Sequence, residues 1–200
     1  MANIGYKNNT QFYKRVIKKY GISARGVHWT CEESQYIRFE ILTNFIVDEI
    51  KSCQIVDAGC GFGEYYNYLF DNNLKPESYI GIDCEEEMID KASKRFLNTK
   101  FILKNILEDK IPSADYYLCS GAMNTLDENE VFTFIKRSYK ASKKGFIFNF
   151  LKDDYLSNVP VNHVLKFCKS ICSQIEIKED YLENDINLFK KIKYHIYFIY

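Results

Sequence analysis

The sequence has little proline, a single tryptophan and no excess of charge of either sign. Proline occupies only 3 of the 200 positions, while aromatic residues make up 16% of the chain. Disordered chains are poor in aromatic residues, so this composition excludes a largely disordered protein and predicts a well-filled core. A typical domain has about 100–150 residues, and we therefore expect residues 1–200 to form one domain.

The net charge is zero, because 27 Lys and Arg balance 27 Asp and Glu. Binding to a nucleic-acid backbone depends on clustered basic side chains that neutralise phosphates. The charge balance disfavours DNA as a partner. It leaves RNA open only if a local basic cluster exists.

Long apolar runs are also missing. No segment approaches the roughly 20 apolar residues that span a bilayer, and the N-terminus lacks a basic stretch followed by an apolar one. The seven cysteines are odd in number and form no C-x-x-C pair, which predicts reduced thiols and no zinc site. We expect a cytoplasmic protein without a membrane or metal partner.

Short apolar segments alternate with amphipathic ones along most of the chain. This alternation is typical of an α/β, Rossmann-like, mostly parallel sheet with helices on both faces, here expected to have seven strands. The expected strands are 54–57, 79–83, 100–104, 114–120, 145–150 and 174–178, with either 185–190 or 194–200 as the last one. The expected helices are 11–20, 32–50, 64–72, 86–97, 128–141 and 161–171. Residues 1–50 are predicted to form an N-terminal helical cap on a core of residues 51–200.

A glycine-rich turn follows the first expected strand. Asp57 precedes three glycines at alternate positions, Gly59, Gly61 and Gly63. Such glycines let the backbone bend sharply and approach a ligand closely at the start of a helix. A dinucleotide-binding turn needs a third small residue where this chain has Glu64, and no phosphate-binding G-x-x-x-x-G-K-[ST] loop is present.

The turn resembles motif I of the class I S-adenosylmethionine-dependent methyltransferases. Further matches follow in order: Asp83 ends the second strand, Asn105 and Ile106 follow the third, and Ser120 ends the fourth. The resemblance implies S-adenosylmethionine as cofactor, with Asp83 on the ribose hydroxyls, Asn105 and Ile106 at the adenine and Ser120 near the methionine portion. The full set of core residues implied to bind the cofactor is Asp57, Gly59, Cys60, Gly61, Asp83, Cys84, Asn105, Ile106 and Ser120.

The segment before the core resembles the cap of small stand-alone bacterial methyltransferases. This likeness implies that Trp29 and Arg38 lie near the cofactor, with Arg38 on its carboxylate. The cap has a weaker likeness to methyltransferases of capsule-modification clusters, which decorate surface sugars or phosphoramidate groups.

Methyl transfer needs in-line approach of the acceptor and a base only when the acceptor must lose a proton. His28 and His163 are the candidate bases, and each has the alternative of a structural hydrogen-bonding role. Tyr13 and Asn124 are the candidate substrate-binding residues. Aromatic faces attract a sulfonium, so Trp29, Tyr13 or Tyr65 is expected at the methyl end unless it packs the cap on the sheet.

Three functions follow from these residues. The first is methyl transfer to an oxygen or nitrogen of a small polar metabolite, or of a capsule or carbohydrate-linked group such as a phosphoramidate. The second is a catalytically silent protein that binds the cofactor or a partner, and the third is RNA methylation. The N-P-P-[YF] segment of DNA amino-methyltransferases is missing, which again disfavours DNA. We expect a monomer or a homodimer.

Overall fold

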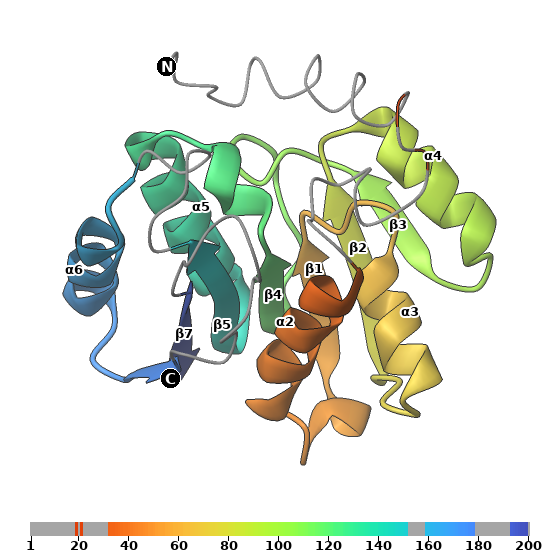
Figure 1. Ribbon diagram of the computed structural model, residues 1–200, viewed down its shortest axis with the longest axis horizontal. Coiled ribbons are helices and arrows are strands. Elements are labelled where there is room, and N and C mark those ends of the chain that lie inside the picture. The colour runs from red at the N-terminus through yellow and green to blue at the C-terminus, as the bar shows by residue number, and fades with distance from the viewer. Residues whose placement is uncertain (1–18, 20, 22–31, 152–158, 179–192, 200) are drawn as a thin grey trace.

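The computed structural model describes residues 19, 21, 32–151, 159–178 and 193–199. Helices and strands alternate along this part of the chain (Figure 1). The strands are β1 (Gln54–Ala58), β2 (Ser78–Asp83), β3 (Lys100–Leu103), β4 (Ala114–Ser120), β5 (Ser142–Leu151), β6 (Ile175–Lys178) and β7 (Lys193–Ile199). The α-helices are α2 (Glu32–Asn44), α3 (Glu64–Asp71), α4 (Glu86–Arg95), α5 (Glu128–Ala141) and α6 (Val161–Ile171), and the 3-10 turns are η2 (Ile50–Ser52) and η3 (Ala122–Thr125).

The strands form one sheet in the order β3-β2-β1-β4-β5-β7-β6. β3, β2, β1, β4 and β5 are parallel to their neighbours, whereas β7 pairs antiparallel with both β5 and β6. The predicted α/β class and the mostly parallel, Rossmann-like sheet are confirmed. Of the two candidates for the last strand, 194–200 corresponds to β7, while 185–190 lies outside the described residues.

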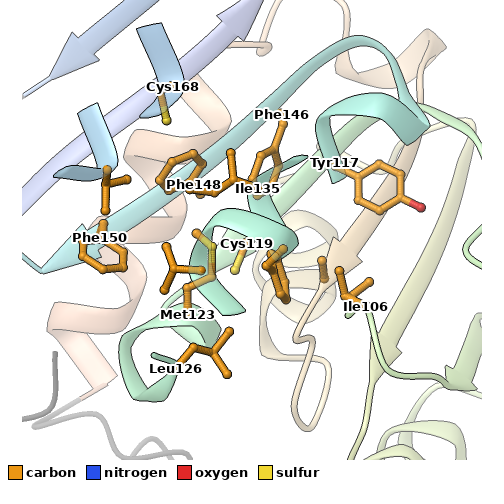
Figure 2. Packing of buried hydrophobic residues seen from close by; sticks show 14 of the residues in the cluster. Ile106, Tyr117, Cys119, Met123, Leu126, Ile135, Phe146, Phe148, Phe150 and Cys168 are labelled. Carbon is orange, nitrogen blue, oxygen red and sulfur yellow. The ribbon is translucent and has the colours of Figure 1, made fainter. Parts of the chain in front are cut away.

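Side chains along a strand alternate between the two faces of the sheet. Both faces carry buried apolar residues here, and helices cover both. Tyr117 and Cys119 of β4 pack with α5 and α6 in one apolar cluster, which Figure 2 shows from close by. Tyr116 and Leu118 point the other way, into a second cluster with α2, α3 and α4. We call these two sides of the sheet the α5 face and the α2 face.

α2 is shorter than predicted. The sequence places its end at Ile50, but the helix ends at Asn44. The tighter bonds Ile46 N–H to Thr43 O (2.9 Å) and Glu49 N–H to Ile46 O (3.1 Å) replace the α-helical pattern there. Ile46 and Ile50 stay buried, so the apolar stripe that predicted a helix continues through these turns.

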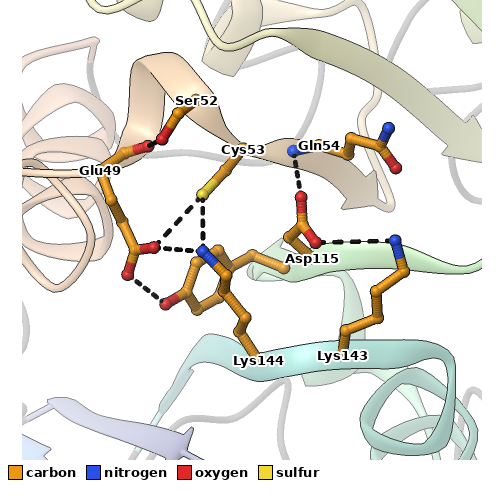
Figure 3. A network of polar contacts seen from close by, with 8 residues as sticks. Glu49, Ser52, Cys53, Gln54, Asp115, Lys143 and Lys144 are labelled. Carbon is orange, nitrogen blue, oxygen red and sulfur yellow. Dashed lines mark hydrogen bonds and ion pairs between the residues drawn. The ribbon is translucent and has the colours of Figure 1, made fainter.

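A polar network around Glu49 fixes the turns that follow α2 at the amino edge of the sheet (Figure 3). Glu49 accepts hydrogen bonds from Tyr116 Oη (2.7 Å) and from Lys144 Nζ. The Lys144 ammonium, followed by the Tyr116 hydroxyl, holds the pKa of Glu49 below its ordinary value. The end of the α2 segment is thereby tied to β4 and β5.

Within the described ranges, no helix is long and apolar enough to cross a membrane. The same part of the chain holds no group of three or more His, Cys, Asp or Glu side chains placed to bind a metal ion. The expected helix over 11–20 and most of the expected cap lie outside the described residues.

Candidate cofactor site

The glycine loop lies between the carboxyl end of β1 and the start of α3. The N–H groups of Gly59 and Cys60 both donate to Ile82 O, at 2.7 and 3.0 Å, which holds the loop against β2. Gly59 has a φ of +84°, and a Cβ added to it would lie 2.1 Å from the Cβ of Ala122. Only glycine fits at this position, so the close approach of the loop backbone to Ala122 requires a residue without a side chain.

The far end of the loop is packed and clamped by α4. A Cβ on Gly63 would lie 3.0 Å from both Phe96 and Phe101. Arg95 donates to the carbonyl of Phe62 at 2.9 Å and to Glu64 Oε1 at 2.5 Å. Arg95 therefore positions the loop without belonging to the sequence motif.

Asp83 connects the loop to the end of β2. Its Oδ2 accepts a hydrogen bond from Gly61 N–H and its Oδ1 accepts one from Glu85 N–H, both at 2.9 Å. Burial raises the pKa of Asp83 to about 6, against the lowering effect of these N–H groups. Each carboxylate oxygen retains a lone pair for a further donor, which fits the predicted contact to two ribose hydroxyls.

Asp57 lies at the base of the loop with an aromatic partner. The Tyr79 hydroxyl donates to Asp57 Oδ2 at 2.5 Å. Burial raises the pKa of Asp57 to about 7, the Tyr79 hydrogen bond lowers it, and the negative charge of Asp83 raises it. Asp57 lies near the end of β1, just before the loop, and its hydrogen-bond partner is Tyr79.

Two buried polar atoms on either side of the loop have no hydrogen-bond partner. They are Ser120 Oγ at the end of β4 and Asn105 Nδ2 after β3. Asn105 Oδ1 accepts from Leu107 N–H at 3.0 Å, which fixes the amide with its NH₂ group unsatisfied. Buried polar groups are almost always paired, so these atoms fit a ligand with polar groups at both ends. The described residues therefore fit S-adenosylmethionine, which has polar groups at both its adenine and its methionine end.

The other predicted cofactor residues of the core have different surroundings. Ile106 is buried in the cluster of the α5 face, and Cys60 is buried in the cluster of the α2 face. Cys84 is exposed directly after Asp83. Arg38 is 1% exposed on α2, where its Nη1 donates to the carbonyl of Ser34.

The predicted catalytic and substrate residues are only partly described. His163 Nδ1 lies 2.9 Å from Glu128 Oε2, and both side chains are about half exposed. Asn124 is buried in η3, the 3-10 turn that directly follows Ser120 and Gly121. His28, Trp29 and Tyr13 lie outside the described residues.

Tyr65 packs in the core. It is 2% exposed, its ring centroid lies 5.2 Å from that of Phe39, and its hydroxyl lies 3.0 Å from Thr43 Oγ1. The packing alternative for Tyr65 is the one that the structure supports, because both its ring and its hydroxyl are engaged beneath α2.

One polar residue of this region was missed by the sequence analysis. Asn149 in β5 is 1% exposed, and neither atom of its amide has a hydrogen-bond partner. The only signal in the sequence was a single amide between Phe148 and Phe150 in the otherwise apolar second half of the strand, residues 146–151.

Comparison with known proteins agrees with this geometry. The family model of a methyltransferase domain matches residues 55–145, which include the glycine loop, Asp83, Asn105 and Ser120. The chain carries a methyltransferase domain. The prediction of a methyltransferase enzyme is confirmed, and the predicted cofactor, S-adenosylmethionine, is supported by the same match. No curated protein sequence matches the chain.

Solved structures share the fold of this methyltransferase at low sequence identity. Magnesium protoporphyrin IX methyltransferase from Synechocystis, with bound S-adenosylhomocysteine, is 13% identical with a TM-score of 0.71, over 96% of this chain and 94% of that chain. A TehB-like methyltransferase from Corynebacterium glutamicum is 16% identical with a TM-score of 0.62, over 97% of both chains. The [4+2]-cyclase SpnF is 11% identical with a TM-score of 0.71, over 88% of this chain and 76% of that chain.

Proposed function

We propose that this methyltransferase transfers the methyl group of S-adenosylmethionine to an oxygen or nitrogen of a small polar molecule. Capsule or carbohydrate-linked groups such as phosphoramidates are the acceptors favoured by the likeness of the cap. The observation that carries the proposal is the pair of unsatisfied buried groups, Asn105 Nδ2 and Ser120 Oγ, on either side of the glycine loop.

The bound cofactor would supply an activated methyl on a positively charged sulfur. This chain's residues would hold the reactants in line, which can contribute about 7–11 kcal/mol of barrier reduction. We propose Asp83 for the ribose and Arg38 for the carboxylate of the methionine portion. The acceptor gains the methyl group and loses its proton, if it holds one, to solvent or to a base, for which His163 with Glu128 is the described candidate.

Calorimetry with S-adenosylmethionine and S-adenosylhomocysteine tests the proposal. We expect both to bind, and Asp83→Ala to weaken binding by more than about tenfold, because it removes the ribose acceptors. Lys94→Ala is the matched control, since Lys94 forms only an exposed ion pair with Asp90 on the outside of α4. Absence of binding by either compound at high micromolar concentration would contradict the proposal.

A second candidate is a protein that binds the cofactor or a partner and does not transfer methyl groups. It is favoured by one structural neighbour, the [4+2]-cyclase SpnF, which has the same fold. A scan of small oxygen and nitrogen acceptors with a methyl-transfer readout separates the candidates. Turnover above the uncatalysed rate would eliminate the silent alternative.

A further inference from the structure

Asn149 is a buried amide without a hydrogen-bond partner. Its side chain is 1% exposed, and both Nδ2 and Oδ1 are unsatisfied. Each buried polar group left unpaired costs about 1–3 kcal/mol. Apolar side chains fill the positions on either side, Phe148 and Phe150, so folding alone gives no reason for an amide here.

A second unsatisfied group lies next to it. Ser120 of β4 and Asn149 of β5 are directly paired in the strand register. Alternation places both side chains on the α2 face, because Leu118 and Ile147 belong to the cluster of that face. Ser120 Oγ and the Asn149 amide therefore stand on neighbouring strands, about 4.8 Å apart in the backbone, and point to the same side.

The part of α2 nearest to these residues is polar as well. The buried residues in the first half of the helix include Ser34, Gln35 and Arg38, whereas Phe39 and Leu42 follow in the second half. The end of α2 leads through η2 to the first residue of β1, so its first half lies toward the carboxyl edge of the sheet (Figure 1). Buried polar residues of α2 thus lie on the side of the sheet to which Ser120 and Asn149 point, and we call this group of residues the polar compartment.

The order of strands indicates what this compartment holds. On the proposed function, the cofactor extends across the sheet from Asn105 after β3, over Asp83 of β2 and the loop of β1, to Ser120 of β4. β5 is the next strand in the sheet. The methyl acceptor must approach the methyl group on the cofactor's sulfur in line. On the proposed function this sulfur lies near Ser120, and Asn149 is the residue paired with Ser120 on the next strand.

We propose that the Asn149 amide binds the methyl acceptor, and that the acceptor carries an uncharged planar group with an N–H and a C=O side by side, as in a carboxamide. The inference rests on the proposed function. An asparagine side chain offers one carbonyl oxygen and one NH₂ group, which pair in plane with such a group. A charged partner in the same place would lack compensation from the neutral Asn149 and Ser120, because the charge of Arg38 is assigned to the cofactor carboxylate on the proposed function. Among carbohydrate-linked acceptors, Asn149 therefore favours a planar amide over a charged phosphoramidate.

The first test is the stability of the ligand-free protein. Asn149→Leu removes both unsatisfied atoms at similar size, so we expect the urea midpoint of unfolding to rise. Ser138→Ala is the matched control, since Ser138 Oγ in α5 is also buried and unsatisfied but lies away from the compartment. A lower midpoint for Asn149→Leu would mean that the amide serves the fold, and would overturn the proposal.

The second test is binding of a simple amide. Benzamide is titrated into the protein saturated with S-adenosylhomocysteine and compared with methyl benzoate, which keeps the carbonyl and lacks the N–H. We expect benzamide to bind at least about tenfold more tightly, and Asn149→Leu, unlike Ser138→Ala, to remove this preference. Affinity for S-adenosylhomocysteine should be unchanged in both variants.

The outcomes separate the two proposals. Failure of S-adenosylhomocysteine to bind the unmodified protein contradicts the proposed function itself. Normal cofactor binding without a preference for benzamide contradicts only the acceptor class. Weaker S-adenosylhomocysteine binding by Asn149→Leu would assign Asn149 to the cofactor and overturn its role in the acceptor site.

Discussion

The Tyr79 hydroxyl donates a 2.5 Å hydrogen bond to Asp57 Oδ2, and both residues are buried beneath the glycine loop. Tyr79→Phe removes this donor and leaves a buried carboxyl group without its partner. We expect a loss of about 1–3 kcal/mol in the free energy of unfolding, measured with urea. The pKa of Asp57 should rise further, because the lost hydrogen bond lowers it.

Tyr66→Phe is the control for this change. The Tyr66 ring lies 5.0 Å from that of Tyr79, but its hydroxyl is not tied to Asp57. Equal destabilisation by the two variants would show that loss of a hydroxyl in general, and not of the bond to Asp57, determines the effect.

Gly59→Ala should damage both stability and cofactor binding. The new Cβ would lie 2.1 Å from Ala122 Cβ, at a φ of +84° that disfavours side chains. Overpacking of this kind costs about 1–3 kcal/mol, in addition to about 1–2 kcal/mol for the backbone conformation. Thermal unfolding and titration with S-adenosylhomocysteine measure the two effects.

Two further variants separate the causes. Gly21→Ala has a φ of +63° and meets no atom within 4 Å, so it reports the backbone penalty alone. Gly59→Ala combined with Ala122→Gly removes the overlap, since the next atom is Ala122 Cα at 3.6 Å. If the double variant is no better than Gly59→Ala, contact with Ala122 is not the cause.

Much of the fold is predictable because its signals are local. β4, α5 and α6 begin and end at the predicted residues, and α5 has a capping box in which Asp127 and Glu130 bond each other's backbone N–H groups. The early end of α2 depends instead on turns locked by contacts such as Thr43 with Tyr65, 22 residues away in the sequence. The position of β7 between β5 and β6 depends on long-range pairing that no local pattern specifies.

The residues of the candidate site also divide into those with a local sequence signal and those without one. The glycines and Asp83 belong to one motif with fixed spacing, so the sequence alone is enough to predict them as site residues. Arg95 and Asn149 lie next to residues that are distant in the chain, Phe62 for the first and Ser120 for the second. The missing hydrogen bonds of Asn149 are a property of its three-dimensional surroundings alone.

Stability should fall as the pH rises from about 4 to about 7. The pKa values of Asp83 and Asp57 are raised by burial to about 6 and about 7, from an ordinary value of 3.8. Below 3.8 both groups are protonated whether the chain is folded or unfolded. Between that value and the raised ones only the unfolded chain ionises, so unfolding becomes more favourable by up to about 1.4 kcal/mol per pH unit and per group.

Urea unfolding of the ligand-free protein across this range measures the effect. Asp57→Asn removes one of the two titrating groups and should flatten the dependence. Glu108→Gln removes a carboxyl group on the surface and should leave it unchanged. A stability that rises across the same range in the unmodified protein would contradict the prediction.

Arg95→Met should weaken cofactor binding more than it weakens the fold. Arg95 holds Phe62 O and Glu64, on either side of Gly63, while its side chain is 28% exposed. Loss of this clamp frees the loop, and we expect severalfold weaker binding of S-adenosylhomocysteine by calorimetry. Lys94→Met, which breaks an exposed pair with Asp90, serves as the control. Unchanged affinity in Arg95→Met would mean that the loop holds its shape without the clamp.

Gly81, in the middle of β2, lies under the Phe101 ring, and a Cβ there would come within 2.4 Å of the ring and 2.9 Å of Cys60 Sγ. The packing behind the glycine loop thus combines a residue without a side chain, Gly81 of β2, with a large one, Phe101 of the neighbouring strand β3. Homologous chains that carry alanine or a larger residue at position 81 should carry a smaller side chain at position 101. Covariation between positions 81 and 101 in an alignment would show that the two residues are constrained as a pair.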